Sequence, residues 1–121
     1  MSGREVPDRR GDPLRISDIE RAAFMLEEIR KLGKDRFLSD PIVQDAAIRR
    51  LEIIGEAAGR VSAKVRESNP NVPWSRMWGF ASIAKHEYWR VNVGRVWAAV
   101  EAMPGIQRRV AQVRAAPASR E

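Results

Sequence analysis

The chain has 121 residues, of which 44% are hydrophobic, and a formal net charge of +6. This length suits one domain with a single core of three to five helices. With no cysteine and one histidine, the sequence excludes disulfide bonds and thiolate metal sites and leaves too few ligands for a structural zinc ion. Neither a membrane span nor the apolar segment of a secretory signal is apparent, so we expect a cytoplasmic protein without membrane contact.

Positive charge is concentrated in the second half of the chain. Residues 1–59 contain 11 Lys or Arg and 12 Asp or Glu, whereas residues 60–121 contain 11 Lys or Arg and only 4 Asp or Glu. A clustered positive field favours a polyanion such as RNA as a partner. The same charges are also compatible with ordinary solvated helix faces, so charge alone leaves nucleic-acid binding open.

The N-terminal part of the chain divides into an arm and a first helix. Residues 1–15 are polar and charged, which predicts a flexible arm. Apolar residues at helical spacing then predict a helix from Ser17 to Leu32, capped by Ser17 or Asp18. Gly33 is placed to end this helix.

The second expected helix is the longest. It begins at Pro41, behind the capping carboxylate of Asp40, and its apolar stripe continues to Val65 over about six turns. Gly55 and Gly59 lie inside it, although each costs roughly 1 kcal/mol of helix propensity relative to Ala. Two small residues four apart predict that another helix comes close there.

The rest of the chain predicts shorter helices. A turn at residues 68–73 precedes a third helix that begins at Trp74 and carries an apolar face as far as Tyr88. Asn92 can cap a fourth helix, which Pro104 and Gly105 separate from a last helix over 106–114. Residues 115–121 are expected to form a frayed tail.

These elements predict an all-α protein, an antiparallel up-and-down bundle of four to five helices in a domain spanning 16–114. No stretch of the sequence alternates with the period of a β-strand. Three of the four tryptophans are expected to anchor the core: Trp74, Trp78 and Trp97.

The most informative segment runs from Gly79 to Tyr88, because it contains the one histidine, His86, with a tyrosine two residues later. Together with segments that precede and follow it at matching intervals, it resembles the HepT-like toxins, which are small all-α ribonucleases of the HEPN superfamily. The matching segments are Arg36–Leu38, Gln44–Ala57, Pro73–Trp74, His86–Tyr88 and Val96–Trp97.

Metal-free RNA cleavage needs a base for the 2′-hydroxyl proton and a fixed cation for the pentacoordinate phosphate. Histidine suits the first role and the guanidinium of arginine the second. The resemblance implies that His86 is the acid/base, and that an Arg-Asn pair should begin five residues before it. Ala81 and Ser82 occupy those positions. Loss of the arginine predicts an activity lower on the order of 100-fold or more, whether this alanine is natural or introduced.

Three basic residues are candidate RNA contacts: Arg76, Lys85 and Arg90. Arg90 would share a helix face with His86 if the helix continued that far. Arg76 and Arg90 are therefore the two candidate replacements for the missing cation, although neither matches the motif spacing.

The resemblance also implies partners. It implies the toxin of a toxin–antitoxin pair, acting on tRNA or mRNA as a homodimer without metal or cofactor. It further implies an MntA-like nucleotidyltransferase antitoxin that transfers AMP to Tyr88. The alternative is a non-catalytic HEPN subunit that docks a nucleotidyltransferase, which Ala81 and Ser82 favour. A helical DNA-binding protein is a more distant alternative, because no recognition helix is apparent.

Several motif residues also have purely structural interpretations. A lone histidine near a helix end can cap a carbonyl group, and Tyr88 on an apolar face can belong to the core. We expect Glu56 to accept a hydrogen bond from an N–H group or an arginine and so to support the fold. Four charged residues of the second helix are expected on solvated or interfacial surface: Asp45, Arg49, Arg50 and Glu52.

Overall fold

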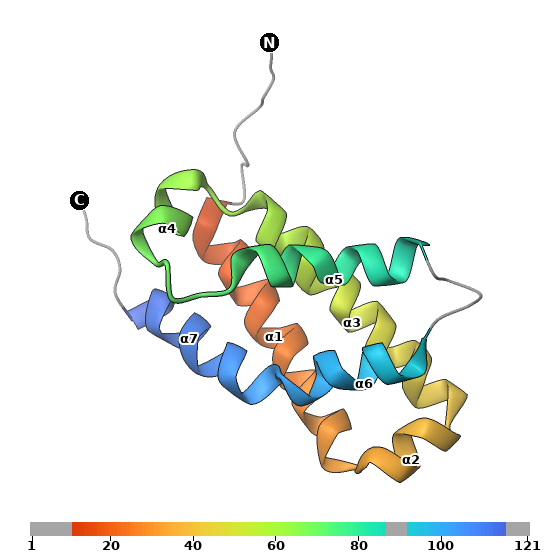
Figure 1. Cartoon of the computed structure of the whole chain (residues 1–121). Coiled ribbons are helices and arrows are strands. Elements are labelled where there is room, and N and C mark those ends of the chain that lie inside the picture. The colour runs from red at the N-terminus through yellow and green to blue at the C-terminus, as the bar shows by residue number, and fades with distance from the viewer. Residues whose placement is uncertain (1–10, 87–91, 116–121) are drawn as a thin grey trace.

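The computed structural model describes residues 11–86 and 92–115, with the backbone alone described for 84–86 and 114–115. These residues form seven helices and no strand, which confirms the predicted all-α class (Figure 1). None of the described helices is long and apolar enough to cross a membrane. The helices are α1 (Gly11–Lys31), α2 (Lys34–Ser39), α3 (Pro41–Arg60), α4 (Ala63–Ser68), α5 (Trp74–His86), α6 (Val93–Glu101) and α7 (Met103–Ala115).

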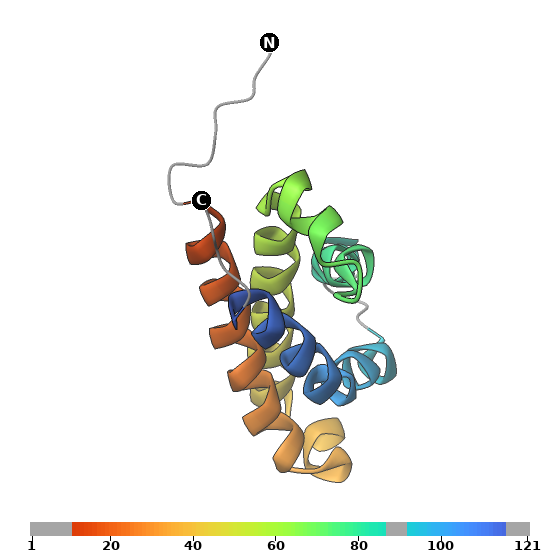
Figure 2. The ribbon, with the colours of Figure 1, turned by 90° about the vertical axis from the view of Figure 1, so that its left-hand side faces the viewer.

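Helix α3 is the centre of the bundle. Figures 1 and 2 show α1 and α3 running side by side, with α5 on the other flank of α3. Helix α7 packs on α1, and α6 contacts both α1 and α3. Their apolar faces enclose one core, whose fully buried side chains include Ile19, Leu26, Phe37, Leu51, Ile54, Met77, Val100 and Ile106.

The first helix begins at Gly11, six residues before the start expected at Ser17. Asp12 stabilises this added stretch, because its carboxylate accepts hydrogen bonds from the backbone N–H of Ser62 (2.8 Å) and from its hydroxyl (2.7 Å). Burial of Ile16 adds an apolar contact in the next turn. The sequence gives no local sign of this long-range bond. At the other end, Gly33 has a φ of 95° and follows the helix, as expected.

The capping of α3 was predicted correctly. The side chain of Asp40 accepts hydrogen bonds from the backbone N–H groups of Ile42 (3.0 Å) and Val43 (3.3 Å). The hydrogen bond from Arg36, followed by those from the backbone, lowers the pKa of the Asp40 carboxyl below its ordinary value. The cap therefore stabilises the helix at neutral pH and weakens as the carboxyl becomes protonated in acid.

The long second helix of the sequence prediction is two helices. Helix α3 ends at Arg60, and α4 begins at Ala63. Ser62 causes the break, because its hydroxyl accepts a hydrogen bond from the N–H of Val65 and caps a new helix (3.2 Å). The apolar stripe continues across the break, which is why periodicity alone did not reveal it. The short α2 was also missed, since six residues give too little periodicity.

The last two helices follow the prediction with one difference. Asn92 caps α6 through a hydrogen bond from the N–H of Arg95 to its side chain (3.1 Å). Helix α7 begins at Met103 and includes Pro104 and Gly105 in its first turn. Proline is tolerated in the first turn of a helix, so this pair does not delay α7 to residue 106.

The tryptophans expected in the core take three different positions. Trp97 is buried against Phe37, with ring centroids 5.2 Å apart, and its indole N–H finds no acceptor among the described residues. Trp74 is half-buried and donates to the carbonyl of Asn69 (3.0 Å). Trp78 is 66% exposed, so its assignment to the core was wrong. It lies about 100° around α5 from the buried Met77, outside the core-facing arc.

Helices α3 and α5 come very close together where they cross. A Cβ atom built on Gly55 would lie 2.5 Å from the backbone nitrogen and 2.6 Å from the Cβ of Ala81. A Cβ atom at Gly59 would lie 3.3 Å from two indole atoms of Trp78. The prediction that a second helix comes close to these glycines is therefore confirmed.

A methyl group at Gly55 tests this contact. Gly55→Ala gains up to about 1 kcal/mol of helix propensity. It must also force α3 and α5 apart, which costs ~1–3 kcal/mol in a packed interior. We expect a net decrease in the free energy of unfolding, measured by urea denaturation.

Gly79→Ala is the matched control, because Gly79 is an exposed helical glycine of α5 with no atom within 4 Å of an added Cβ. We expect this variant to be as stable as the parent or more stable. Equal stabilisation by both substitutions would contradict the close contact.

Candidate active site

Helix α5 carries the motif and is fixed at its start by local hydrogen bonds. The carbonyl of Pro73 accepts from the N–H of Met77 (3.0 Å), and the indole of Trp74 binds back to Asn69. Met77 and Phe80 then face the core, whereas Gly79 is exposed. The helix is therefore anchored at its N-terminal end and carries the motif residues toward its C-terminal end.

Ala81 and Ser82 stand where the resemblance implies an Arg-Asn pair, and they lie on different sides of this helix. Ala81 is 8% exposed and packs directly on Gly55. Ser82 is exposed. Neither side chain carries a positive charge, and only the hydroxyl of Ser82 can donate a hydrogen bond. Any longer side chain at residue 81 would start from the α3 contact and extend along the seam between the two helices.

His86 is the last residue of α5, and the structure describes its backbone only. Five residues separate it from Ala81, a rise of about 7.5 Å along the helix axis. Lys85 is likewise described by its backbone alone, and Tyr88 and Arg90 lie outside the described residues. The roles expected for these four side chains therefore stay predictions.

Arg76 lies at the opposite end of α5 from His86. It is exposed, and ten residues separate the two, about 15 Å along the axis. The replacement of the missing guanidinium by Arg76 therefore stays a prediction. A role as a more distant RNA contact stays a prediction.

The opposite wall of the seam is supplied by α3. Gly59 meets Trp78 and Gly55 meets Ala81, so the two helices run antiparallel. The turn of α3 before Gly55 therefore faces the last turn of α5. Glu52 belongs to this turn, and its Oε1 lies 2.9 Å from Nη1 of Arg49, whose side chain lines a groove between α1 and α3.

The sequence predicts solvated or interfacial positions for Arg49 and Glu52, and the side chain of Arg49 is 62% exposed. Their i, i+3 spacing was a signal for the ion pair, but its position relative to α5 depends on the helix register. Glu56, on the next turn, is exposed and has no hydrogen bond or ion pair within the described part of the chain. The expectation that it supports the fold as an acceptor was wrong.

The described residues contain no group of three or more His, Cys, Asp or Glu side chains that could hold a metal ion. The exposed side chains that α5 offers include the guanidinium of Arg76, the hydroxyl of Ser82 and the indole of Trp78. Residue 81, where the resemblance implies a guanidinium, carries no charge.

Comparison with known proteins gives the family. Residues 19–113 match the family model described as Ribonuclease HepT-like. The chain is 29% identical over 96 residues to "Putative RNase TTE0752" of Caldanaerobacter subterraneus subsp. tengcongensis, covering 78% of this chain and 86% of the relative. It is 34% identical over 93 residues to "Putative RNase MJ1380" of Methanocaldococcus jannaschii, covering 76% and 85%.

A third relative, "Probable ribonuclease HepT" of Thermococcus cleftensis, is 33% identical over 101 residues, covering 82% of this chain and 92% of the relative. No solved structure gives a significant match. The family match spans α5 with Ala81, Ser82 and His86, and also α3 with the glycines that α5 packs against. The chain therefore belongs to the HepT-like ribonuclease family of the HEPN superfamily.

Proposed function

We propose that this chain is the toxin of a toxin–antitoxin pair, a metal-independent ribonuclease that acts on tRNA or mRNA and is impaired by Ala81. The observation that carries the proposal is the position of Ala81. It lies five residues before the one histidine and against Gly55 of α3. The helical framework of a HepT-like ribonuclease is thus present, whereas the cation that its chemistry requires is absent at this residue.

The reaction assigned to this framework is an internal transfer at phosphorus. His86 removes the proton of a ribose 2′-hydroxyl, and the 2′-oxygen attacks the adjacent phosphorus. The bond to the 5′-oxygen breaks, and that oxygen leaves with a proton supplied by an acid. Negative charge builds on the non-bridging oxygens, where a guanidinium at residue 81 would stabilise it. With Ala81 this stabilisation is missing, so the step is slow.

Restoring the arginine tests the proposal. We expect Ala81→Arg to cleave total tRNA, without added metal and with a chelator present, at least ~100-fold faster than the parent chain. Ala81→Arg combined with His86→Ala should return cleavage to the background. Because Ala81 packs on Gly55, circular dichroism must show that each variant is folded.

If folded Ala81→Arg protein cleaves no faster than the parent, the ribonuclease proposal fails. The non-catalytic HEPN subunit that docks a nucleotidyltransferase then becomes the better interpretation. Cleavage that persists in the His86→Ala background would also contradict the assigned mechanism, because the base would not be His86.

We also propose a homodimer that buries Trp78. This side chain is 66% exposed and lies over Gly59, next to the exposed Ser82, one turn further along α5. An exposed tryptophan beside a helix seam is an effective interface anchor. A second copy seated there would bring two motif helices together around one RNA phosphate.

Trp78→Ala tests the dimer. We expect it to raise the dissociation constant of the dimer at least ~10-fold in sedimentation equilibrium, since truncating a central interface residue costs ~2 kcal/mol or more. Ile42→Ala is the control, because Ile42 is 80% exposed at the start of α3, away from α5. An unchanged constant for Trp78→Ala would rule out this interface.

The antitoxin of the pair is proposed to be an MntA-like nucleotidyltransferase that transfers AMP to Tyr88. The added anion, two residues after His86, would repel an RNA phosphate from the same cleft. The intact mass of the chain after co-expression with such an enzyme checks this. A mass shift that persists in Tyr88→Phe would place the modification elsewhere.

A further inference from the structure

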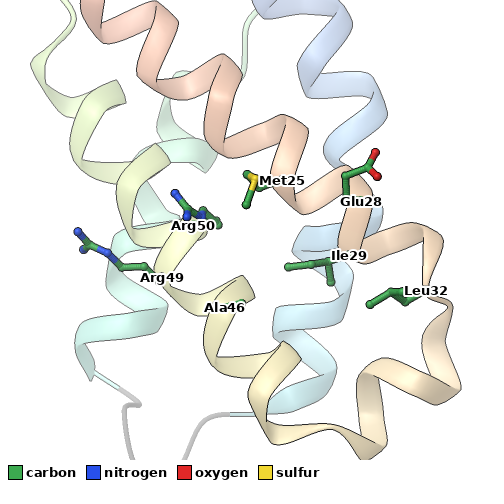
Figure 3. A pocket seen from close by; sticks show the side chains of 7 residues that line it. All are labelled: Met25, Glu28, Ile29, Leu32, Ala46, Arg49 and Arg50. Carbon is green, nitrogen blue, oxygen red and sulfur yellow. The ribbon is translucent and has the colours of Figure 1, made fainter.

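A second surface, separate from the motif seam, lies between α1 and α3. A groove of about 410 Å³ opens there (Figure 3). One wall is apolar, because Met25 and Ile29 point from α1 toward α3, and Leu32 follows them in the turn after α1. Ala46 adds to the apolar lining from α3. Both Met25 (40% exposed) and Leu32 (45%) present their side chains to solvent.

No described helix covers this groove. In Figure 3, α6 and α7 lie behind α1 and α3, on the opposite face of the pair. The exposed apolar surface also continues around α1 to Phe24, the residue before Met25, which is 55% exposed. Exposed apolar side chains grouped in this way are typical of a binding surface rather than of scattered surface residues.

Two kinds of charged residue border the groove. Glu28 and Arg49 already have partners, since Glu28 pairs with Lys31 (3.2 Å) and Arg49 with Glu52. Arg50 is half-buried at the groove and has no ion-pair partner among the described residues. Lys31 thus neutralises the carboxylate of Glu28 at the groove, whereas the guanidinium of Arg50 is available to a ligand.

Arg21 extends this pattern along α1. It lies one turn before Met25 on the same helix face and is exposed, again without an ion-pair partner in the part of the chain that the structure describes. A ligand complementary to this surface therefore has apolar side chains for the groove and carboxylates for Arg21 and Arg50.

We propose that the α1–α3 groove binds an amphipathic, acidic helix of a partner protein. A groove between two antiparallel helices accepts a third helix, whose residues at i, i+4 and i+7 fill the apolar wall. Carboxylates beside that stripe then reach the two unpaired guanidinium groups. This site is independent of RNA cleavage, because it lies on the flank of α3 away from α5.

Other occupants fit less well. An RNA backbone would use the arginines but would leave Met25, Ile29 and Leu32 in contact with phosphates and water. A second copy of this chain would bring its own Arg21 and Arg50 to the same face, and like charges oppose that arrangement. An amphipathic acidic helix can cover the apolar wall with its apolar residues and pair its carboxylates with Arg21 and Arg50.

The probe is a labelled synthetic helical peptide with leucines at i, i+4 and i+7 and glutamates flanking them, titrated by fluorescence anisotropy. We expect saturable binding to the full chain. Arg50→Glu and Leu32→Ser should each weaken it about tenfold or more, equivalent to ~1.4 kcal/mol. Arg76→Glu and Leu38→Ser, which change an exposed arginine of α5 and an exposed apolar residue of α2 outside the groove, should leave it unchanged.

Exchanging the charges of the peptide and of residue 50 gives a second test. An unfolded variant would lose binding to every peptide, so it could not bind the exchanged peptide more tightly. A peptide with its glutamates replaced by lysines should bind the parent chain poorly and bind Arg50→Glu more tightly than it binds the parent. Three results would overturn the proposal: no saturable binding of the acidic peptide, equal weakening by the control substitutions, or displacement of the peptide by tRNA. A decrease in oligomer mass caused by Leu32→Ser would also overturn it, since the groove would then hold a second copy.

Discussion

Helix α5 touches α3 through backbone as well as side chain. The nitrogen of Ala81 and its Cβ both lie within 2.6 Å of the position that a Cβ would take on Gly55. Glycine at residue 55 is therefore a steric requirement for this crossing, and its cost in helix propensity is offset by the packing that it permits. The contact fixes the register of the two helices, and with it the position of every motif residue on α5 up to His86.

Because of the close contact between Gly55 and Ala81, the residues that position α5 can be told apart from the residues that would carry the chemistry. The framework depends on small residues at the crossing, and it tolerates Ala81 because alanine fits against glycine. In the proposed mechanism the chemistry depends on a charged group at the same residue, which alanine does not supply. A chain can therefore keep the fold and the family's helix arrangement while it loses most of the transition-state stabilisation. The groove beside α1 lies on the other flank of α3, so a partner could bind there without touching the motif seam.

The sequence predicted the features that are encoded locally. Asp40 and Asn92 cap helices where expected, and Gly55 indicated a close helix contact before its partner was known. The prediction was wrong where distant residues decide the outcome: Asp12 extends α1 by binding Ser62, fifty residues away. The same limit applies to the site. The spacing of residues in the sequence identified which residues resemble the family motif. Only the register between α3 and α5 shows which residues of α3 lie against α5.

The most direct test of the account is a double-mutant cycle at the crossing, with the free energy of unfolding measured for the parent, Gly55→Ala, Ala81→Gly and the double variant. Removing the Cβ of Ala81 relieves one of the two closest contacts, whereas its backbone nitrogen remains 2.5 Å from the new methyl group. The account predicts partial rescue: the double variant is more stable than the sum of the single effects, by about 0.5–3 kcal/mol, but less stable than the parent. Strictly additive effects would show that residues 55 and 81 are not in contact, and would remove the basis for placing residue 81 at this seam.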